Sequence, residues 1–409
     1  MLMAAAAAAV EGAARREQEG TPMDKTFPHP IYTTTGNMQL NAVQTPTRCA
    51  VVTGANKGIG LETVRQLAKA GVTVVLTARN EKMGMKATRL LQESGVSNVV
   101  FHQLDVRDPE SIESLVNFIT TQFGRLDILV NNAGVTGVEV DGDALRAKNI
   151  DPETWLAGKA VNLIQDVMKI TNEKAKECLD TNYYGLKNLT EALVPLLQRS
   201  TSGARIVNVS SVRGELRRIP NEQIRKEIGD VETLTEDKID RILQKFLHDL
   251  QHNALEANGW QMMLPPYSIS KATLNAYTRL LAKKYPSMCI NCVHPGYVNT
   301  DINWRTGTMM VDEGAEGSVM LALPPEGGPT GCYFDQALRR IPEFPNLTHC
   351  YEELRQEIDE RSANEFLLSV FCVEEATGCS WRRRQGTVPL GGNETRNRLV
   401  IILSSFDVY

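Results

Sequence analysis

The segment Cys49–Gly71, CAVVTGANKGIGLETVRQLAKAG, combines three patterns whose order predicts a fold. The apolar run CAVV comes first, and the helical pattern LETVRQLAKAG comes last and stops at a glycine. Between them, TGANKGIG carries Gly54, Gly58 and Gly60, which let the backbone approach a bound group closely. A glycine cluster alone is usually just a turn. Between a strand and a helix it favours a loop that binds the pyrophosphate of a dinucleotide.

Strand and helix patterns continue to alternate after this segment, with short connections between them. The helical patterns include EKMGMKATRLLQESG and PESIESLVNFITTQFG. This alternation predicts an α/β protein of the Rossmann type between Cys49 and Asp335, with a doubly wound parallel sheet of about seven strands and helices on both faces. The strand-like runs after the first include VTVVLTAR, NVVFHQLDV, LDILVNNAG, ARIVNVSS and MCINCVHPG.

Two segments, 138–178 and 214–264, are longer than such a sheet needs. Within the second, residues 236–250 predict an amphipathic helix with Thr235 as its N-cap. The apolar stripe of this helix must lie on another part of the protein. The stripe consists of Ile239, Ile242, Leu243, Phe246, Leu247 and Leu250.

The two ends of the chain do not share this pattern. Residues 1–47 are low in complexity and predict a disordered extension, whose alanine run suits neither a secretory nor a transit peptide. We therefore predict a cytoplasmic protein, with a plastid as the alternative. Residues 48–336 form the predicted domain, with a helical insertion at about 214–264. Residues 337–409 are an unassigned tail, and we interpret its basic run WRRRQG as a solvated patch.

The composition argues against several classes of partner. A net charge of −5 gives no reason to expect nucleic acid or an anionic membrane, and no apolar run is long enough to span a bilayer. The eight cysteines are scattered over the chain. Cys289 and Cys292 lie in an apolar strand-like run without a second pair at zinc spacing, so we expect no metal site.

The stretch YSISK places Tyr267 and Lys271 on one face of a predicted helix, because residues four apart are neighbours there. A free tyrosine loses its proton at about pH 10, and a neighbouring ammonium lowers that pKa by favouring the phenolate. The pair is either a tuned acid–base group or two residues on a solvated helix. The spacing alone favours the second interpretation.

The second strand-like run ends LTARN, where a site for NAD usually has an acidic residue to hold the ribose 2′-hydroxyl. Arg79 stands there instead, and Lys57 lies inside the glycine loop. Two cations and no carboxylate favour the 2′-phosphate of NADP(H) as the ligand. The alternative is that both side chains merely face solvent.

Seven motifs occur in an order that resembles the short-chain dehydrogenase/reductase family. The chain is most similar to the plant monomeric carbonyl-reductase-like branch, which includes menthone, neomenthol and salutaridine reductases, and the resemblance covers about residues 49–336. The seven motifs are TGANKGIG, LDV at 104–106, NNAG at 131–134, TNYYG, VNVSS, YSISK and HPGYVNT.

The resemblance implies a catalytic group of four residues. Tyr267 would donate a proton to the developing alkoxide. Lys271 would lower the pKa of Tyr267 and hold the nicotinamide ribose, and Ser211 would hydrogen-bond the substrate oxygen while Ser210 points into the sheet. Asn182 would hold a water that links Lys271 to solvent.

The resemblance also implies a set of cofactor contacts. Asp105 and Val106 would contact the adenine, and Asn132 and Gly134 would flank the adenosine ribose. Val298 and Thr300 would meet the carboxamide. The complete predicted cofactor set is Gly54, Asn56, Lys57, Gly58, Ile59, Gly60, Arg79, Asp105, Val106, Asn132, Ala133, Gly134, Tyr267, Lys271, Pro295, Gly296, Val298 and Thr300.

These residues together predict an NADPH-dependent reductase of a small apolar ketone of terpenoid or alkaloid type. The alternatives are a non-catalytic NADP(H)-binding interaction protein and an enzyme that works in the direction of alcohol oxidation. We expect the pocket to be lined by residues after Gly134 and by residues 212–213, 262–264 and 303–310. The 55 residues between Ser211 and Tyr267 resemble the insertion of monomeric members, so we predict a monomer.

Overall fold

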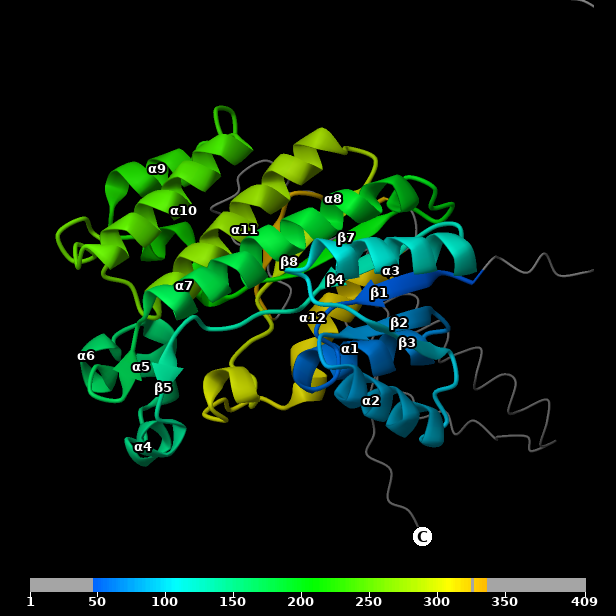
Figure 1. The fold of residues 1–409 in the computed structure, drawn as a ribbon, viewed down its shortest axis with the longest axis horizontal. Helices are drawn as coiled ribbons and strands as arrows, with labels where there is room; N and C mark the ends of the chain where they lie inside the picture. The colour runs from blue at the N-terminus through cyan, green and yellow to red at the C-terminus, as the bar shows by residue number, and fades with distance from the viewer. Residues whose placement is uncertain (1–46, 325–326, 337–409) are drawn as a thin grey trace, which may run out of the picture. The chain divides into compact units, whose positions relative to one another are not determined.

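The computed structural model describes residues 47–324 and 327–336, and the predictions for residues 1–46 and 337–409 lie outside these ranges. Seven parallel strands form one sheet in the order β3-β2-β1-β4-β7-β8-β9 (Figure 1), which confirms the predicted fold class. The strands are β1 (Cys49–Val52), β2 (Thr73–Ala78), β3 (Val99–Gln103), β4 (Ile128–Asn131), β7 (Arg205–Val209), β8 (Cys289–Val293) and β9 (Tyr333–Phe334).

The strand order reverses beside β1, which pairs with β2 on one side and with β4 on the other. In an open parallel sheet, ligands bind at the carboxyl ends of the strands at such a reversal. TGANKGIG follows β1 and NNAG begins at the last residue of β4, so the topology brings these two motifs together.

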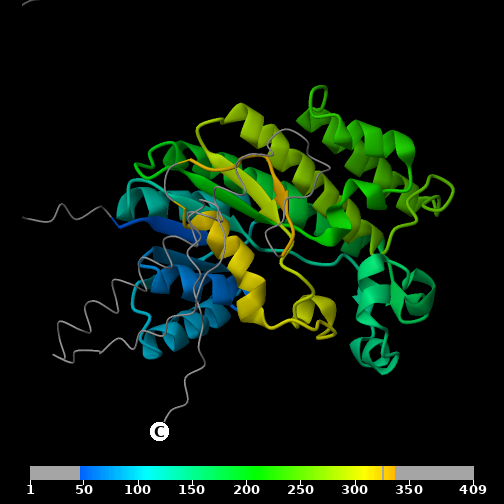
Figure 2. The ribbon, with the colours of Figure 1, turned by 180° about the vertical axis from the view of Figure 1, so that it is seen from behind.

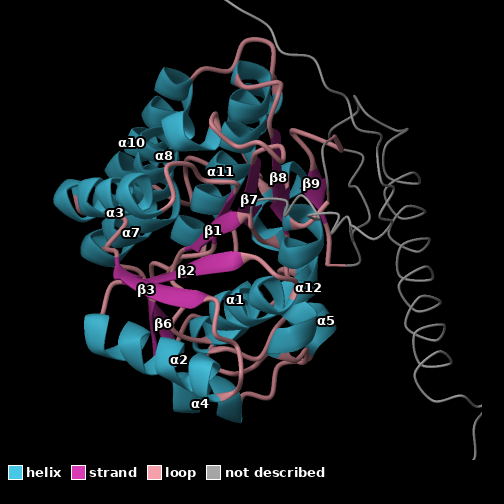
Figure 3. Cartoon of the chain, turned by 90° about the vertical axis from the view of Figure 1, so that its right-hand side faces the viewer, coloured by secondary structure: helices cyan, strands magenta, loops and turns pink. Residues whose placement is uncertain are grey.

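Successive residues of each strand face opposite helical layers, as the pleat of a strand requires. Val51 and Leu129 pack in one apolar cluster, whereas Val52 and Val130 pack in the other. Figure 3 shows the sheet between these two layers. The first layer contains α3 (Pro109–Gln122), α7 (Asn172–Leu179), α8 (Leu186–Leu197) and α11 (Pro265–Lys284), and the second contains α1 (Gly58–Lys69), α2 (Glu81–Glu93) and α12 (Val311–Ala322).

Capping residues determine where several helices begin. The Asn80 side chain accepts a hydrogen bond from the Met83 N–H at the start of α2, and Asp108 caps α3 just before Pro109. Helix α1 differs, because Lys57 is its N-cap residue and no side chain caps it. The first N–H groups of α1 therefore remain available to a phosphate at the glycine loop.

The insertion at 214–264 contains α9 (Glu222–Gly229) and α10 (Glu236–Gln251), which confirms the predicted amphipathic helix. Thr235 caps α10 through a hydrogen bond of 3.2 Å from the Lys238 N–H to its hydroxyl. The stripe of α10 packs against α7 and α11 (Figure 1). Four of its side chains are fully buried, namely Ile239, Ile242, Leu243 and Phe246, while Leu247 and Leu250 are partly buried in the same cluster.

The insertion at 138–178 forms a small subassembly of short elements, which lie together in both Figure 1 and Figure 2. It has its own apolar cluster, in which Trp155 and Ile164 pack with Leu264 and Tyr297 of the main fold. Its elements before α7 are β5 (Glu139–Val140), α4 (Gly142–Ala147), α5 (Pro152–Ala157), α6 (Val161–Ile164) and β6 (Met168–Lys169).

Candidate active site

The glycine loop requires glycine at its first position for two reasons. Gly54 has a φ of +61°, in the left-handed region, and a Cβ there would lie 2.9 Å from the Cα of Ala133. At Gly60 a Cβ would lie 2.4 Å from the side-chain nitrogen of Asn132. The loop and the NNAG motif are therefore packed backbone against backbone.

Thr53 and Asn132 hold these two motifs together. The Thr53 hydroxyl oxygen accepts hydrogen bonds of 2.9 Å from the N–H groups of Asn132 and Ala133. The Asn132 amide donates to the Thr53 carbonyl at 2.8 Å and to the Gly54 carbonyl at 3.2 Å. The structure thus gives Asn132 a role that the motif did not predict, which is to fix the shape of the glycine loop.

Both predicted phosphate-binding cations have exposed side chains at the rim of this cleft. Lys57 forms an ion pair of 2.7 Å with Asp301, and Arg79 lies 3.9 Å from Glu177. Both are about 60% exposed, which leaves them free to move to another anion. Asp105, after β3, is paired with Arg107 at 3.1 Å. A turned glycine loop, the uncapped start of α1 and two exposed cations fit a phosphorylated dinucleotide.

The segment after β8 completes this side of the cleft. The position of a Cβ on Gly58 lies 3.4 Å from the Thr300 methyl group, so Thr300 lies against the glycine loop. Gly296 has a φ of +90°, and a Cβ there would collide with the Met309 sulfur. Val298 is buried. The structure therefore brings Thr300 of HPGYVNT beside TGANKGIG, whereas Val298 packs against Gly314 of α12.

The four predicted catalytic residues gather at the start of α11. Tyr267 and Lys271 lie one turn apart, with the Lys271 ammonium nitrogen 5.7 Å from the centroid of the Tyr267 ring. The Ser211 side chain lies close enough to Tyr267 to lower the pKa of the phenol through hydrogen bonding. Ser210 instead bonds to Asn275 at 2.5 Å and is buried, which confirms that Ser210 points into the interior.

Asn182 lies in a π-helical turn, Asp180–Gly185, between α7 and α8. It exchanges two hydrogen bonds of 2.8 Å with the backbone of Val135. A Cβ on Gly134 would lie 3.4 Å from the Asn182 carbonyl oxygen and 3.7 Å from the Lys271 ammonium. The side chains of Asn182 and Lys271 therefore lie close together beside Gly134.

Burial dominates the electrostatics of this group. It raises the pKa of Tyr267 to about 12, although the Ser211 hydrogen bond and the Arg213 charge oppose the shift. It lowers the pKa of Lys271 from 10.5 to about 8. The pKa of Tyr267 therefore lies above its ordinary value in this structure, because desolvation of the phenolate outweighs the neighbouring charges, and the lowering by Lys271 stays a prediction.

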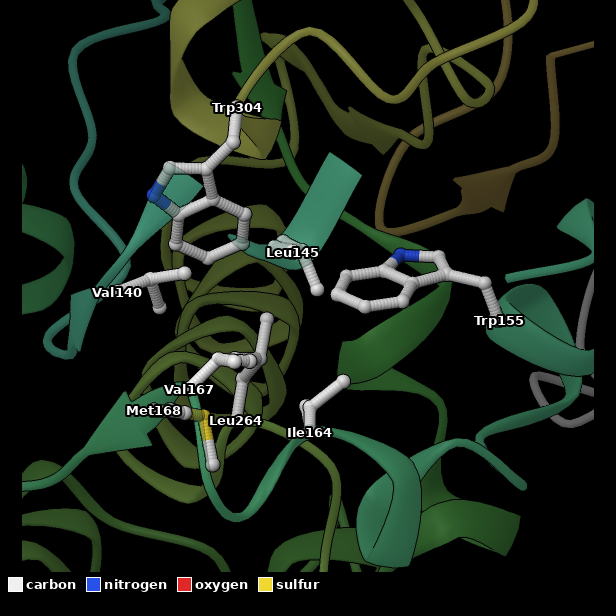
Figure 4. A pocket seen from close by; sticks show the side chains of 8 residues that line it. All are labelled: Val140, Leu145, Trp155, Ile164, Val167, Met168, Leu264 and Trp304. Atoms are coloured by element: carbon white, nitrogen blue, oxygen red, sulfur yellow. The ribbon is translucent and has the colours of Figure 1, made fainter. Parts of the chain in front are cut away.

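An apolar pocket is lined in part by Leu264, three residues before Tyr267 (Figure 4), and the Tyr267 ring packs against the same apolar cluster. Of the predicted lining, Leu264 and Trp304 are present, whereas Met262 lies in the main core. Most of the wall comes from the 138–178 insertion, which follows the residues after Gly134 that were predicted to line the pocket. For the more distant residues of the insertion, its length was the one available signal. The lining residues are Val140, Leu145, Trp155, Ile164, Val167, Met168, Leu264 and Trp304.

Comparison with known proteins agrees with this geometry. Residues 48–222 match the family described as short chain dehydrogenase. The chain is 53% identical to short-chain dehydrogenase/reductase 1 of Saponaria officinalis over 289 residues, which are 70% of this chain and 93% of that protein. This protein belongs to the short-chain dehydrogenase/reductase family. It is therefore an oxidoreductase that acts on alcohol and ketone groups.

Two solved structures from the plant branch resemble the chain closely. Salutaridine reductase from Papaver somniferum is 48% identical, with a TM-score of 0.66, and the match covers 70% of this chain and 99% of that one. Menthone neomenthol reductase from Mentha piperita is 44% identical, with a TM-score of 0.62, and the match covers 71% and 99%. The predicted family and branch are confirmed.

The described residues, 47–324 and 327–336, contain no helix that is both long and apolar enough to cross a membrane. In the same ranges no three histidine, cysteine, aspartate or glutamate side chains are placed to hold a metal ion together. Cys289 and Cys292 of the C-x-x-C pair bond separately, to the carbonyl oxygens of Gly327 and Cys332.

Proposed function

We propose that the protein is an NADPH-dependent reductase that transfers a hydride to the carbonyl of a small apolar ketone of terpenoid or alkaloid type. The observation that carries the proposal is the closeness of Ser211 to Tyr267, whose ring packs against the same apolar cluster as the pocket. Two hydroxyl donors there can stabilise the oxyanion that forms as a carbonyl is reduced. NADPH, when bound, supplies the hydride.

Tyr267 supplies the proton in this scheme. With a pKa of about 12 it stays protonated at neutral pH, and an alkoxide is a much stronger base than a phenolate. Transfer from Tyr267 to the product oxygen is therefore favourable without an acidified phenol. Ser211 holds the same oxygen in place. Lys271 and Asn182 lie near Tyr267. They relay a proton from solvent to Tyr267 after it has protonated the product.

Two features support NADP(H) over NAD(H). Lys57 and Arg79 are exposed cations that follow β1 and β2. No carboxylate stands at the end of β2, where the ribose 2′-hydroxyl of NAD would need one. A guanidinium and an ammonium both bind phosphate well.

The pocket supports an apolar substrate. Its eight lining side chains are all hydrophobic, and two are tryptophans that can cover the face of a ring system. The names of the two related structures, salutaridine reductase and menthone neomenthol reductase, agree with a ketone substrate of this type. We also propose that the protein is a monomer, because α10 covers the outer surface of α7 and α11.

The decisive experiment follows NADPH absorbance with a panel of cyclic terpenoid and alkaloid ketones, for the wild type, for Tyr267→Phe and for a chain ending at Gln336. Turnover that is lost in Tyr267→Phe and kept in the shortened chain supports the proposal. Equal slow oxidation of NADPH by wild type and Tyr267→Phe would rule it out. Tight NADPH binding with no ketone turned over would favour the non-catalytic alternative, and sedimentation as a dimer would refute the monomer.

A further inference from the structure

A buried arginine follows the candidate catalytic serine by two residues. Arg213 is only 5% exposed. Its backbone N–H donates to the Ser211 hydroxyl oxygen at 3.2 Å, which leaves the Ser211 proton free for another acceptor. The turn that carries both residues is packed tightly on α11, because a Cβ on Gly214 would lie 2.7 Å from the Lys271 backbone. The backbone of Arg213 is therefore part of the catalytic group.

The side chain of Arg213 reaches a different part of the molecule. Its guanidinium donates to the carbonyl oxygens of Trp155 and Leu156, the latter at 3.3 Å. These carbonyls lie in the last turn of α5, and the Trp155 carbonyl also accepts a hydrogen bond of 2.9 Å from the Gly158 N–H. Glu215, a nearby carboxylate, bonds to Arg217 and Arg218 instead. The Arg213 guanidinium thus donates hydrogen bonds to the backbone of the insertion rather than to a carboxylate.

Glycine at the end of α5 makes room for this contact. Gly158 has a φ of +79°, and a Cβ there would lie 3.2 Å from a terminal nitrogen of Arg213 and 3.4 Å from one of Arg218. A side chain at position 158 would crowd the guanidinium of Arg213. The backbone of the insertion is therefore shaped around the arginine.

Trp155, whose carbonyl Arg213 binds, is one of the aromatic residues that line the pocket. Trp155 is 6% exposed, stacks with Tyr297 at a ring distance of 6.2 Å, and meets Trp304 edge-on at 6.4 Å. These three rings come from α5 and from the segment after β8, and Trp155 and Trp304 both line the pocket. The guanidinium of Arg213 is therefore a polar link between α5 and the Ser211 turn.

We propose that Arg213 is a positioning residue that sets the distance between the Trp155 wall and the Ser211–Tyr267 pair, and so determines where a substrate held against Trp155 places its oxygen. The proposal rests on the proposed ketone reduction. A guanidinium presents its donors in a planar fork that spans two successive carbonyls, whereas lysine ends in a single compact ammonium.

The test compares Arg213→Met, which keeps the length and apolar stem, with Arg213→Lys, and uses Arg217→Met as a matched control at an exposed arginine of the same loop. Trp155 emission is isolated by subtracting the spectrum of the corresponding Trp155→Phe protein. We expect Arg213→Met to shift this emission toward that of a solvated indole. We also expect a rise of about tenfold or more in the ketone KM, while the NADPH Kd changes by less than about twofold. Arg217→Met should leave all three values unchanged.

Added guanidinium ion should partly restore the KM of Arg213→Met and have no effect on the control. A wild-type KM and wild-type Trp155 emission in Arg213→Met would overturn the proposal. So would equal losses of ketone and NADPH binding in a variant that is still folded. If Arg213→Met does not fold, Gly158→Ala provides the same displacement and the same readouts. If the wild type reduces no ketone, the proposed function fails, while the Trp155 emission still decides the role of Arg213.

Discussion

The side-chain amide of Asn182 donates a hydrogen bond of 3.0 Å to the hydroxyl of Ser270, the residue just before Lys271. Ser270 in turn donates to the Tyr267 carbonyl at 2.7 Å. The π-helical turn and the first turn of α11 are therefore joined by side chains. Groups held on packed helices keep their geometry better than groups on loops. The spacing of the catalytic residues is thus set by helix packing.

The first prediction concerns the phenol itself. Tyr267→Phe removes one hydroxyl whose recorded partner is Ser211, so the fold and the affinity for NADPH should stay unchanged. Loss of a positioned proton donor should lower kcat/KM for ketone reduction by about 10²–10⁴-fold. Steady-state kinetics, with NADPH binding measured by fluorescence, separate the two effects. A loss of NADPH affinity as large as the loss of activity would contradict the assigned role.

The second prediction is a pH dependence that arises from Lys271. Burial lowers the pKa of Lys271 to about 8, so the ammonium form is complete below that pH and is lost as the pH rises through it. Reduction consumes a proton that passes by this group, so kcat/KM should fall as the pH rises above about 8. Lys271→Arg keeps its charge there and should lack this fall. A wild-type profile that stays flat up to the ordinary lysine pKa would exclude the mechanism.

The fold and the catalytic group could be predicted from the sequence because each motif lies at the end of a strand or inside a strongly periodic helix. TGANKGIG follows β1, NNAG begins at the last residue of β4 and VNVSS ends two residues after β7, and parallel strands bring their carboxyl ends to one edge. Thr235 and the stripe of α10 are local signals of the same kind. Such information is contained in windows of fewer than about twenty residues.

The pocket and the electrostatics could not be predicted in this way. Helices α4, α5 and α6 are too short to show a period, so Trp155 has no local mark of its function. Its contact with Arg213 joins residues 58 positions apart. The raised pKa of Tyr267 depends on burial by the insertion, which the spacing of YSISK does not report.

The third prediction uses two glycines that share a backbone conformation. Gly54 and Gly71 have φ values of +61° and +84°, but only Gly54 has atoms near the position of its missing Cβ. Gly71→Ala should cost about 1–2 kcal/mol in the free energy of unfolding. Gly54→Ala should cost more and should also weaken NADPH binding, because Ala133 must move. Urea unfolding and NADPH titration of both variants test this, and equal behaviour of the two would disprove it.

The fourth prediction concerns α10. Phe246 is fully buried and meets Trp260 edge-on at 5.2 Å. Phe246→Ala should lower the free energy of unfolding by about 3–5 kcal/mol. Leu90 on α2 is 54% exposed, and Leu90→Ala should change stability by no more than about 0.5 kcal/mol. A Phe246→Ala protein as stable as the Leu90→Ala protein would show that α10 is not part of the folded core.

The last prediction separates the two exposed cations that follow β1 and β2. Lys57 is bound to Asp301 at 2.7 Å, and Arg305 also bonds to Asp301, so Lys57 must leave an ion pair before it can reach a phosphate. Arg79 is held only loosely, at 3.9 Å from Glu177. Arg79→Gln should therefore raise the NADPH Kd by more than Lys57→Gln does, and neither should affect the NADH Kd.

Asp301→Asn should have the opposite effect, because it releases Lys57 for the phosphate. We expect the NADPH Kd to fall by a few fold, because an exposed ion pair contributes only about that much free energy. The NADH Kd should be unchanged. Titration at low and high salt provides the control, since a phosphate contact weakens as salt rises. If Asp301→Asn tightens NADPH and NADH equally, the ion pair acts on loop shape rather than on the 2′-phosphate, and the role of Lys57 in choosing NADP(H) must be given up.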